Sequence, residues 1–170
     1  MKLSTTMPSH RKTSLTAGIL YLLTFVSIPS IALYSNAKSD NFILGAGPDT
    51  GAIIAGVLEV IVALAGIATA VVLFPMLKKQ REGFALGLVA SRTLEAACIF
   101  VGVAFLMTVV HLRQSGPGAD SLVVSNALVS LYDRIFLLSQ SFIPGINDLL
   151  LGFLLYKSRL IPRAISMIGM

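Results

Sequence analysis

The fold is decided by residues 51–112, which read GAIIAGVLEVIVALAGIATAVVLFPML (51–77), KKQREG (78–83) and FALGLVASRTLEAACIFVGVAFLMTVVHL (84–112). The first and third segments are long and apolar, and a short basic segment joins them. A helix rises ~1.5 Å per residue, so about 20 apolar residues cross the hydrocarbon core of a bilayer. The sequence therefore predicts a hairpin of two membrane-spanning helices, 51–77 and 84–112.

The composition of the whole chain indicates the same class of protein. Of its 170 residues, 55% are hydrophobic and only 12% are charged, and its mean hydropathy is +0.86. Soluble domains average about 25% charged residues. The net charge of +5 comes from short clusters of Lys and Arg beside apolar segments, a pattern typical of membrane orientation. We expect an all-α, polytopic bundle whose main partner is the lipid bilayer and which binds no nucleic acid.

Two more spans are predicted, at residues 15–34 and 135–156. Residues 122–134 are expected to form an amphipathic extension at the outer surface, because their polar residues recur at helical spacing. The alternative places a span at 122–143 and a short, half-buried return at 145–156. Residues 1–170 thus form one transmembrane domain of about four spans, and residues 164–170 resemble the start of another helix.

The distribution of Lys and Arg predicts a cytoplasmic N-terminus in the inner membrane. With that orientation, three basic residues outside the spans face outward, namely Lys38, Arg113 and Arg134. The other basic residues outside the spans then face the cytoplasm: Lys2, Arg11, Lys12, Lys78, Lys79, Arg81, Lys157, Arg159 and Arg163. Keeping the last three of these inside requires one crossing between residues 122 and 157.

Ionisable residues inside the predicted spans are the candidate site. A charge in lipid costs ~2.5–3.5 kcal/mol on insertion scales, so such residues usually face the bundle interior. Counting ~1.5 Å per residue puts Arg92 and Asp148 at matching depths, ~12 Å from the cytoplasmic ends of their helices. Glu95 lies one turn above Arg92. We expect an Arg92–Asp148–Glu95 cluster joined by Asn147, with Glu59 nearer the outer side.

Two backbone features accompany these residues. Pro144 and Gly145 are expected to bend or break their helix just before Asn147 and Asp148. Such a break exposes backbone groups that can bind ligands, although a proline more often only kinks a span. Around Glu59, small residues recur every three or four positions and predict close helix packing, or a pocket lined by Glu59: Ala52, Gly56, Ala63, Gly66 and Ala70.

No residue pattern indicates catalysis, a metal or a cofactor. The one cysteine, Cys98, lies within an apolar segment and suits a small buried residue. His10 and His111 have no partner at a ligand spacing. No HExxH or GxSxG motif occurs. We therefore expect a protein that is not an enzyme, has no cofactor and has no metal site.

Several stretches resemble a bacterial integral-membrane family catalogued as domain of unknown function 4386. The resemblance rests on 17–25, 58–60, 73–78, 87–92, 95–97, 99–102, 142–147 and 151–163. It implies a helical inner-membrane protein with no established activity. It also implies further spans after Pro162 and Arg163, which this chain lacks.

Three functions remain open from the sequence. The first is a small binding, sensory or accessory membrane protein, which could form a homo-oligomer. The sequence does not identify its ligand. The second is a transporter or proton-coupled carrier subunit that uses the intramembrane charges, although few spans and no visible inverted repeat disfavour it. The third, an intramembrane enzyme, lacks a legible catalytic set.

Overall fold

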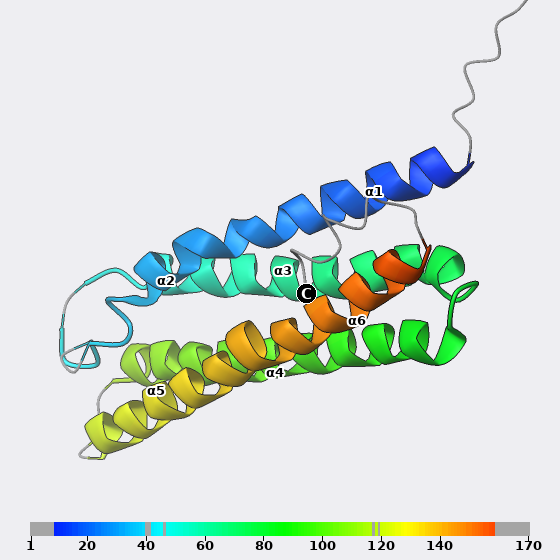
Figure 1. Ribbon diagram of the computed structural model, residues 1–170. Helices are drawn as coiled ribbons and strands as arrows, with labels where there is room; N and C mark the ends of the chain where they lie inside the picture. The colour runs from blue at the N-terminus through cyan, green and yellow to red at the C-terminus, as the bar shows by residue number, and fades with distance from the viewer. Residues whose placement is uncertain (1–8, 40–41, 46, 117, 119, 159–170) are drawn as a thin grey trace, which may run out of the picture.

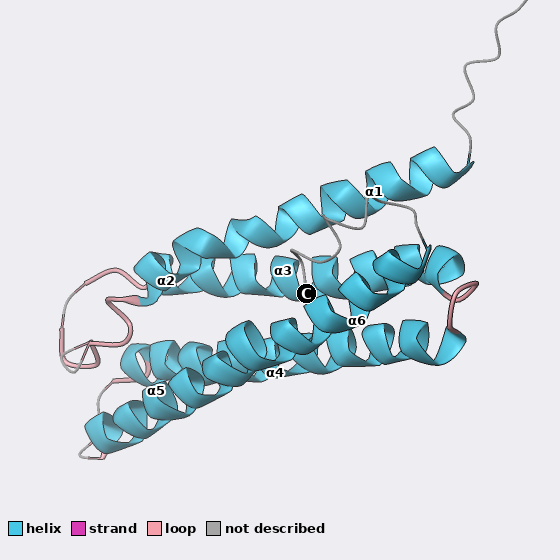
Figure 2. Ribbon diagram, in the orientation of Figure 1, coloured by secondary structure: helices cyan, strands magenta, loops and turns pink. Residues whose placement is uncertain are grey.

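The computed structural model describes residues 9–39, 42–45, 47–116, 118 and 120–158. In this part of the chain the helices form one elongated bundle without strands (Figures 1 and 2). The elements are α1 (Ser9–Leu23), the 3-10 helix η1 (Thr24–Ser27), α2 (Ile28–Tyr34), α3 (Thr50–Leu77), α4 (Glu82–Gln114), α5 (Ser121–Leu137), the π-helix η2 (Leu138–Phe142) and α6 (Ile143–Ser158).

Four helical runs among the described residues are long and apolar enough to cross a membrane: Arg11–Tyr34, Thr50–Leu77, Glu82–Gln114 and Ser121–Lys157. The predicted fold class, an all-α bundle of about four spans, is therefore confirmed. The hairpin of α3 and α4 turns at residues 78–81, and we call this end of the bundle the Lys78 end. The opposite end carries residues 35–39 and the α4–α5 turn, and we call it the Lys38 end (Figure 1).

The run from α5 through η2 to α6 continues in one direction and does not reverse at Pro144 (Figure 1). The alternative, a short return at 145–156, requires a turn at Pro144 and Gly145, and the structure has no turn there. The helix also continues through residue 134, so the division between an interfacial segment (122–134) and a span (135–156) stays a prediction. Four polar residues of the segment 122–134 are exposed: Asn126, Ser130, Asp133 and Arg134. Residues 164–170 lie outside the described part of the chain.

Helix α4 lies at the centre of the packing, against α3, α5 and α6, whereas α1 and α2 pack on α3. The predicted small-residue stripe of α3 is buried along its whole length: Ala52, Gly56, Glu59, Ala63, Gly66 and Ala70. Gly56 brings α3 close to Met107 of α4, since a Cβ there would meet the methionine methyl at 3.3 Å. The prediction that this stripe allows close helix packing is confirmed.

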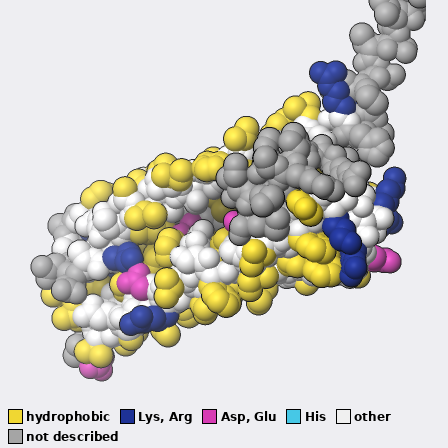
Figure 3. Space-filling model, in the orientation of Figure 1, with side chains coloured by type: hydrophobic (Ala, Val, Ile, Leu, Met, Phe, Trp, Pro, Cys, Tyr) yellow, Lys and Arg dark blue, Asp and Glu magenta, His cyan; other side chains and the backbone are white. Residues whose placement is uncertain are grey.

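Apolar clusters fill the two ends of the bundle, and the intramembrane polar residues lie between them. The cluster at the Lys38 end includes Tyr34, Phe42 and Leu106, and the one at the Lys78 end includes Leu77, Leu88 and Leu154. In the space-filling view the flank of the bundle is largely apolar, with Lys and Arg gathered towards the ends and acidic atoms showing in the middle (Figure 3). The buried polar groups are thus sealed from both ends.

Loop residues of the Lys38 end are fixed by Arg113, at the end of α4. Its guanidinium donates to Asp49 Oδ1 at 2.7 Å, to the Gly45 carbonyl at 2.9 Å and to the Gly47 carbonyl. The same group stacks over the Phe42 ring, 4.5 Å from its centroid. The loop between α2 and α3 is therefore held down on α4.

Candidate functional site

The first of two buried polar clusters surrounds Glu59 of α3, whose exposed fraction is 2%. Tyr132 of α5 donates a hydrogen bond to Glu59 Oε1 at 2.9 Å, and Tyr34 of α2 donates to Oε2 at 3.3 Å. The two tyrosine rings meet edge to face, with centroids 5.4 Å apart. One carboxylate thus ties three helices together, and we call these three residues the Glu59 cluster.

An ion pair covers the Glu59 cluster from the Lys38 end. Lys38 Nζ lies 2.5 Å from Asp133 Oδ1 and 5.2 Å from the centroid of the Tyr132 ring. Both charged side chains are partly open to solvent. An exposed pair of this kind stabilises a protein by about 0–1 kcal/mol, so its main effect here is to cover the tyrosines.

The second buried cluster joins α4 to α6. Arg92 Nη1 donates to Glu95 Oε2 at 3.0 Å and to Oε1 at 3.3 Å, and both side chains are about nine-tenths buried. Asn147 of α6, which is fully buried, donates from Nδ2 to Glu95 Oε2 at 2.6 Å. We call Arg92, Glu95 and Asn147 the Arg92 cluster. The other amide atom, Asn147 Oδ1, is buried without a hydrogen-bond partner among the described residues.

The π-helix η2 sets which residues of α6 face this cluster. Pro144 has no N–H to donate to the carbonyl four residues earlier, and the Ile143 N–H bonds to Leu138 O, five residues back. Ser125, Tyr132 and Ser139 are buried at intervals of seven residues, which would next bury residue 146. The extra residue of η2 turns the helix so that Asn147 is buried and Ile146 is 39% exposed. The expected break at Pro144 and Gly145 is therefore a change of register rather than an interruption.

A polar cavity of about 300 Å³ adjoins the Arg92 cluster. It is bounded by the first helical run, by α3 and α4, and by the η2–α6 region. Its wall contains Tyr21, Thr24, Phe25, Ser27, Ile28, Val62, Arg92, Glu95, Gln140, Pro144 and Asp148. Asp148 is exposed to this space. Three of the five predicted polar residues, Arg92, Glu95 and Asp148, thus line one cavity.

The expected pairing of Arg92 with Asp148 is wrong. Among the ion pairs of the described residues, Arg92 pairs with Glu95, its neighbour three residues along the same helix. Glu95 is one turn from Arg92 on the same helix, so it is within reach however α6 is rotated. Asp148 follows the buried Asn147 and lies on the open side of α6. Asp148 therefore faces the cavity without forming a salt bridge to Arg92.

Glu59 lies outside this cavity, as its different depth predicts. Between the two lies a gap lined by Glu59, Tyr132 and Gln140 among others, and it is too narrow to hold a water molecule. Cys98, expected to be a buried apolar residue, is half-buried and contributes to the wall of this gap. The two clusters are thus separate sites in this conformation.

Several residues of the site were not singled out by the sequence. The sequence suggests only interfacial anchoring for the tyrosines Tyr21, Tyr34 and Tyr132, and it indicates no role for Phe25 and Gln140. The seven-residue interval between Ser125, Tyr132 and Ser139 is a signal that could have identified the inner face of α5. No comparable signal exists for Tyr21 and Phe25, since residues 15–34 contain no charged side chain that would mark an inner face.

A family profile described as "Domain of unknown function (DUF4386)" matches residues 16–170, nearly the whole chain. The chain belongs to this family. No curated protein and no solved structure matches it. The functional argument for this DUF4386 chain therefore rests on its geometry. Within the described residues, no three His, Cys, Asp or Glu side chains are grouped to hold a metal ion.

Proposed function

We propose that this DUF4386 chain is a membrane-embedded binding protein for small organic cations, with the polar cavity beside the Arg92 cluster as its site. The observation that carries the proposal is the charge balance of the cavity wall. Glu95 neutralises Arg92 through two contacts of 3.0 and 3.3 Å, so that among the described wall residues the Asp148 carboxylate is an excess negative charge. A charge at this depth is costly unless something compensates for it.

Aromatic rings beside Asp148 suit an ammonium group. Tyr21 and Phe25 both line the cavity, and their ring centroids lie 6.3 Å apart in an edge-to-face arrangement. An ammonium group near such ring faces gains about 0.5–2 kcal/mol, with the larger values in desolvated sites. The hydroxyl groups of Thr24 and Ser27 already donate to backbone carbonyls, so their oxygens are left to accept hydrogen bonds. The cavity thus offers acceptors and π-faces to a ligand that donates.

Replacing the cavity carboxylate tests this function. We expect methylammonium and tetramethylammonium chloride to raise the melting temperature of the purified chain in lipid nanodiscs, as stabilising ligands do. Asp148→Asn should weaken methylammonium binding about tenfold or more, because a hydrogen bond to a charged group contributes about 1.5–3 kcal/mol. Asp120→Asn is the matched control, since Asp120 is an exposed carboxylate at the start of α5. Equal binding by the wild type and Asp148→Asn would disprove the assignment.

A flux measurement distinguishes the alternative function, a transporter, from a binding protein. The closed gap between the cavity and Glu59 favours a binding role, because a carrier needs a route past that point. Saturable uptake of labelled methylammonium into proteoliposomes, lost in Asp148→Asn, would instead support a carrier. We propose no catalytic step, since Arg92 and Glu95 neutralise each other.

We also propose that the Lys78 end faces the cytoplasm, supported by the basic residues Lys78, Lys79 and Arg81 in its turn. A membrane-impermeant maleimide applied to intact cells should then label Ser130→Cys but not Gln80→Cys, both in a Cys98→Ser background. Ser130 is exposed towards the Lys38 end and Gln80 lies in the opposite turn. The reverse labelling pattern would place the N-terminus outside.

A further inference from the structure

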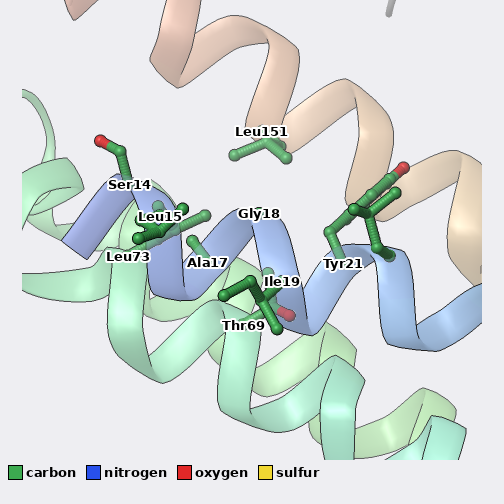
Figure 4. Close-up of a pocket in the computed structure, with 10 residues that line it drawn as sticks. Ser14, Leu15, Ala17, Gly18, Ile19, Tyr21, Thr69, Leu73 and Leu151 are labelled. Carbon is green, nitrogen blue, oxygen red and sulfur yellow. The ribbon is translucent and has the colours of Figure 1, made fainter. Parts of the chain in front are cut away.

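An apolar groove of about 530 Å³ runs between α1, α3 and α6. Its wall is almost entirely hydrocarbon and comprises Ser14, Leu15, Ala17, Gly18, Ile19, Tyr21, Leu22, Thr69, Leu73 and Leu151 (Figure 4). The groove exists because α1 packs on α3 but makes no close contact with α6 among the described elements. Gly18 lies at its middle and leaves it open, since a Cβ there would meet nothing within 4 Å (Figure 4).

The groove adjoins the polar cavity, because Tyr21 belongs to both walls. Each surrounding helix shows the same order. On α6, Asp148 lines the cavity and Leu151, one turn later, lines the groove. On α3, Val62 lines the cavity and Thr69, two turns later, lines the groove. The two spaces therefore lie end to end, the polar cavity deeper in the bundle and the apolar groove towards the Lys78 end.

We propose that the ligand is a single-chain amphiphilic amine, with its ammonium group beside Asp148 and its hydrocarbon tail in the groove. This inference rests on the proposed function and adds the chemical class of the ligand. Charge complementarity places the head group, since the described residues that line the groove include no charged side chain. The position of the groove next to the cavity, with Tyr21 in both walls, places the tail.

The direction of the site argues against a phospholipid of the adjacent leaflet. Such a lipid keeps its head group at the membrane surface and directs its tails inward. Here the apolar part lies nearer the Lys78 end and the charged part lies deeper, at the level of Asp148. An amine with one tail can adopt this orientation, because its small head group is compensated by the carboxylate and the rings.

A series of amines of increasing chain length tests the inference in nanodiscs of zwitterionic lipid. We expect octylammonium to stabilise the wild type at a concentration at least about tenfold below that of methylammonium, since each buried CH₂ contributes about 0.8 kcal/mol. Part of that gain comes from partitioning into the bilayer, so the decisive comparison is between variants. Gly18→Leu should weaken octylammonium binding and leave methylammonium binding unchanged. Gly83→Leu is the matched control, because Gly83 is also in open space but lies at the start of α4.

Further measurements keep the two proposals distinguishable. Leu22→Trp narrows the groove at an exposed position and should act like Gly18→Leu, which guards against a folding defect in one variant. n-Octanol has the tail without the charge and should stabilise weakly, with no response to Asp148→Asn. Methylammonium binding with no effect of Gly18→Leu or Leu22→Trp on octylammonium would overturn the tail site alone. Binding of neither amine would overturn both proposals.

Discussion

Arg92→Met is expected to lower the free energy of unfolding by about 3–5 kcal/mol, the usual cost of removing one partner from a buried ion pair. Arg92 and Glu95 are each about nine-tenths buried, and Glu95 also accepts from the fully buried Asn147. Without the guanidinium, the Glu95 carboxylate keeps only the amide as a partner. Equilibrium unfolding in mixed micelles of a mild detergent and dodecyl sulfate measures the loss.

A double-mutant cycle separates the pair from other effects of the substitution. Arg92→Met combined with Glu95→Leu should recover much of the stability, because removing both charges of a buried pair is often neutral. The cycle between Arg92→Met and Asp148→Asn should show much weaker coupling, since Asp148 forms no ion pair with Arg92. Asp148→Asn alone should raise the free energy of unfolding rather than lower it, because it removes an uncompensated charge at membrane depth. Strong coupling of Arg92 to Asp148 but not to Glu95 would contradict the structure.

The bundle itself was predictable from the sequence because membrane insertion depends on apolar length and charge position. The hairpin of α3 and α4, the buried stripe around Glu59 and the depth of Arg92 and Glu95 all follow from helical rise and period. Lipid contributes to this predictability, since spanning segments must satisfy their backbone hydrogen bonds as helices. For the first helix of the hairpin the bounds agree closely, with α3 at 50–77 against a predicted 51–77.

The sequence predicted that Glu95 and Asn147 lie beside Arg92, but not the separation of Asp148 from Arg92, which depends on how α6 is rotated about its axis. One extra residue in η2 buries Asn147 and leaves Asp148 facing the cavity, and sequence periodicity alone does not register that shift. The partners of Glu59 were missed for a related reason. Tyr132 crosses α4 at Gly102, where a Cβ would lie 3.4 Å from the tyrosine ring, and that contact joins residues thirty positions apart.

Glu59→Leu is expected to destabilise the chain by about 2–6 kcal/mol, because it leaves two buried hydroxyl groups without an acceptor at about 1–3 kcal/mol each. Tyr132 and Tyr34 donate only to this carboxylate among their side-chain hydrogen bonds to the described residues. Leucine has nearly the volume of glutamate but no lone pairs, so packing changes little while both bonds are lost. The same unfolding titration measures the effect, and an unfolding free energy equal to that of the wild type would show that the Glu59 cluster does not stabilise the bundle.

Two further sets of variants test whether the lost stability comes from the unsatisfied hydroxyl groups, one by keeping an acceptor and one by removing the donors. Glu59→Gln keeps an acceptor oxygen and should cost less than Glu59→Leu. Adding Tyr34→Phe and Tyr132→Phe to Glu59→Leu should recover part of the stability, because no hydroxyl group is then left unsatisfied. Methylammonium should still bind to Glu59→Gln with the wild-type affinity, since a gap too narrow for water separates Glu59 from the cavity at Asp148. Loss of binding in that variant would mean that the two clusters act as one site, and the carrier alternative would then be favoured over a binding protein.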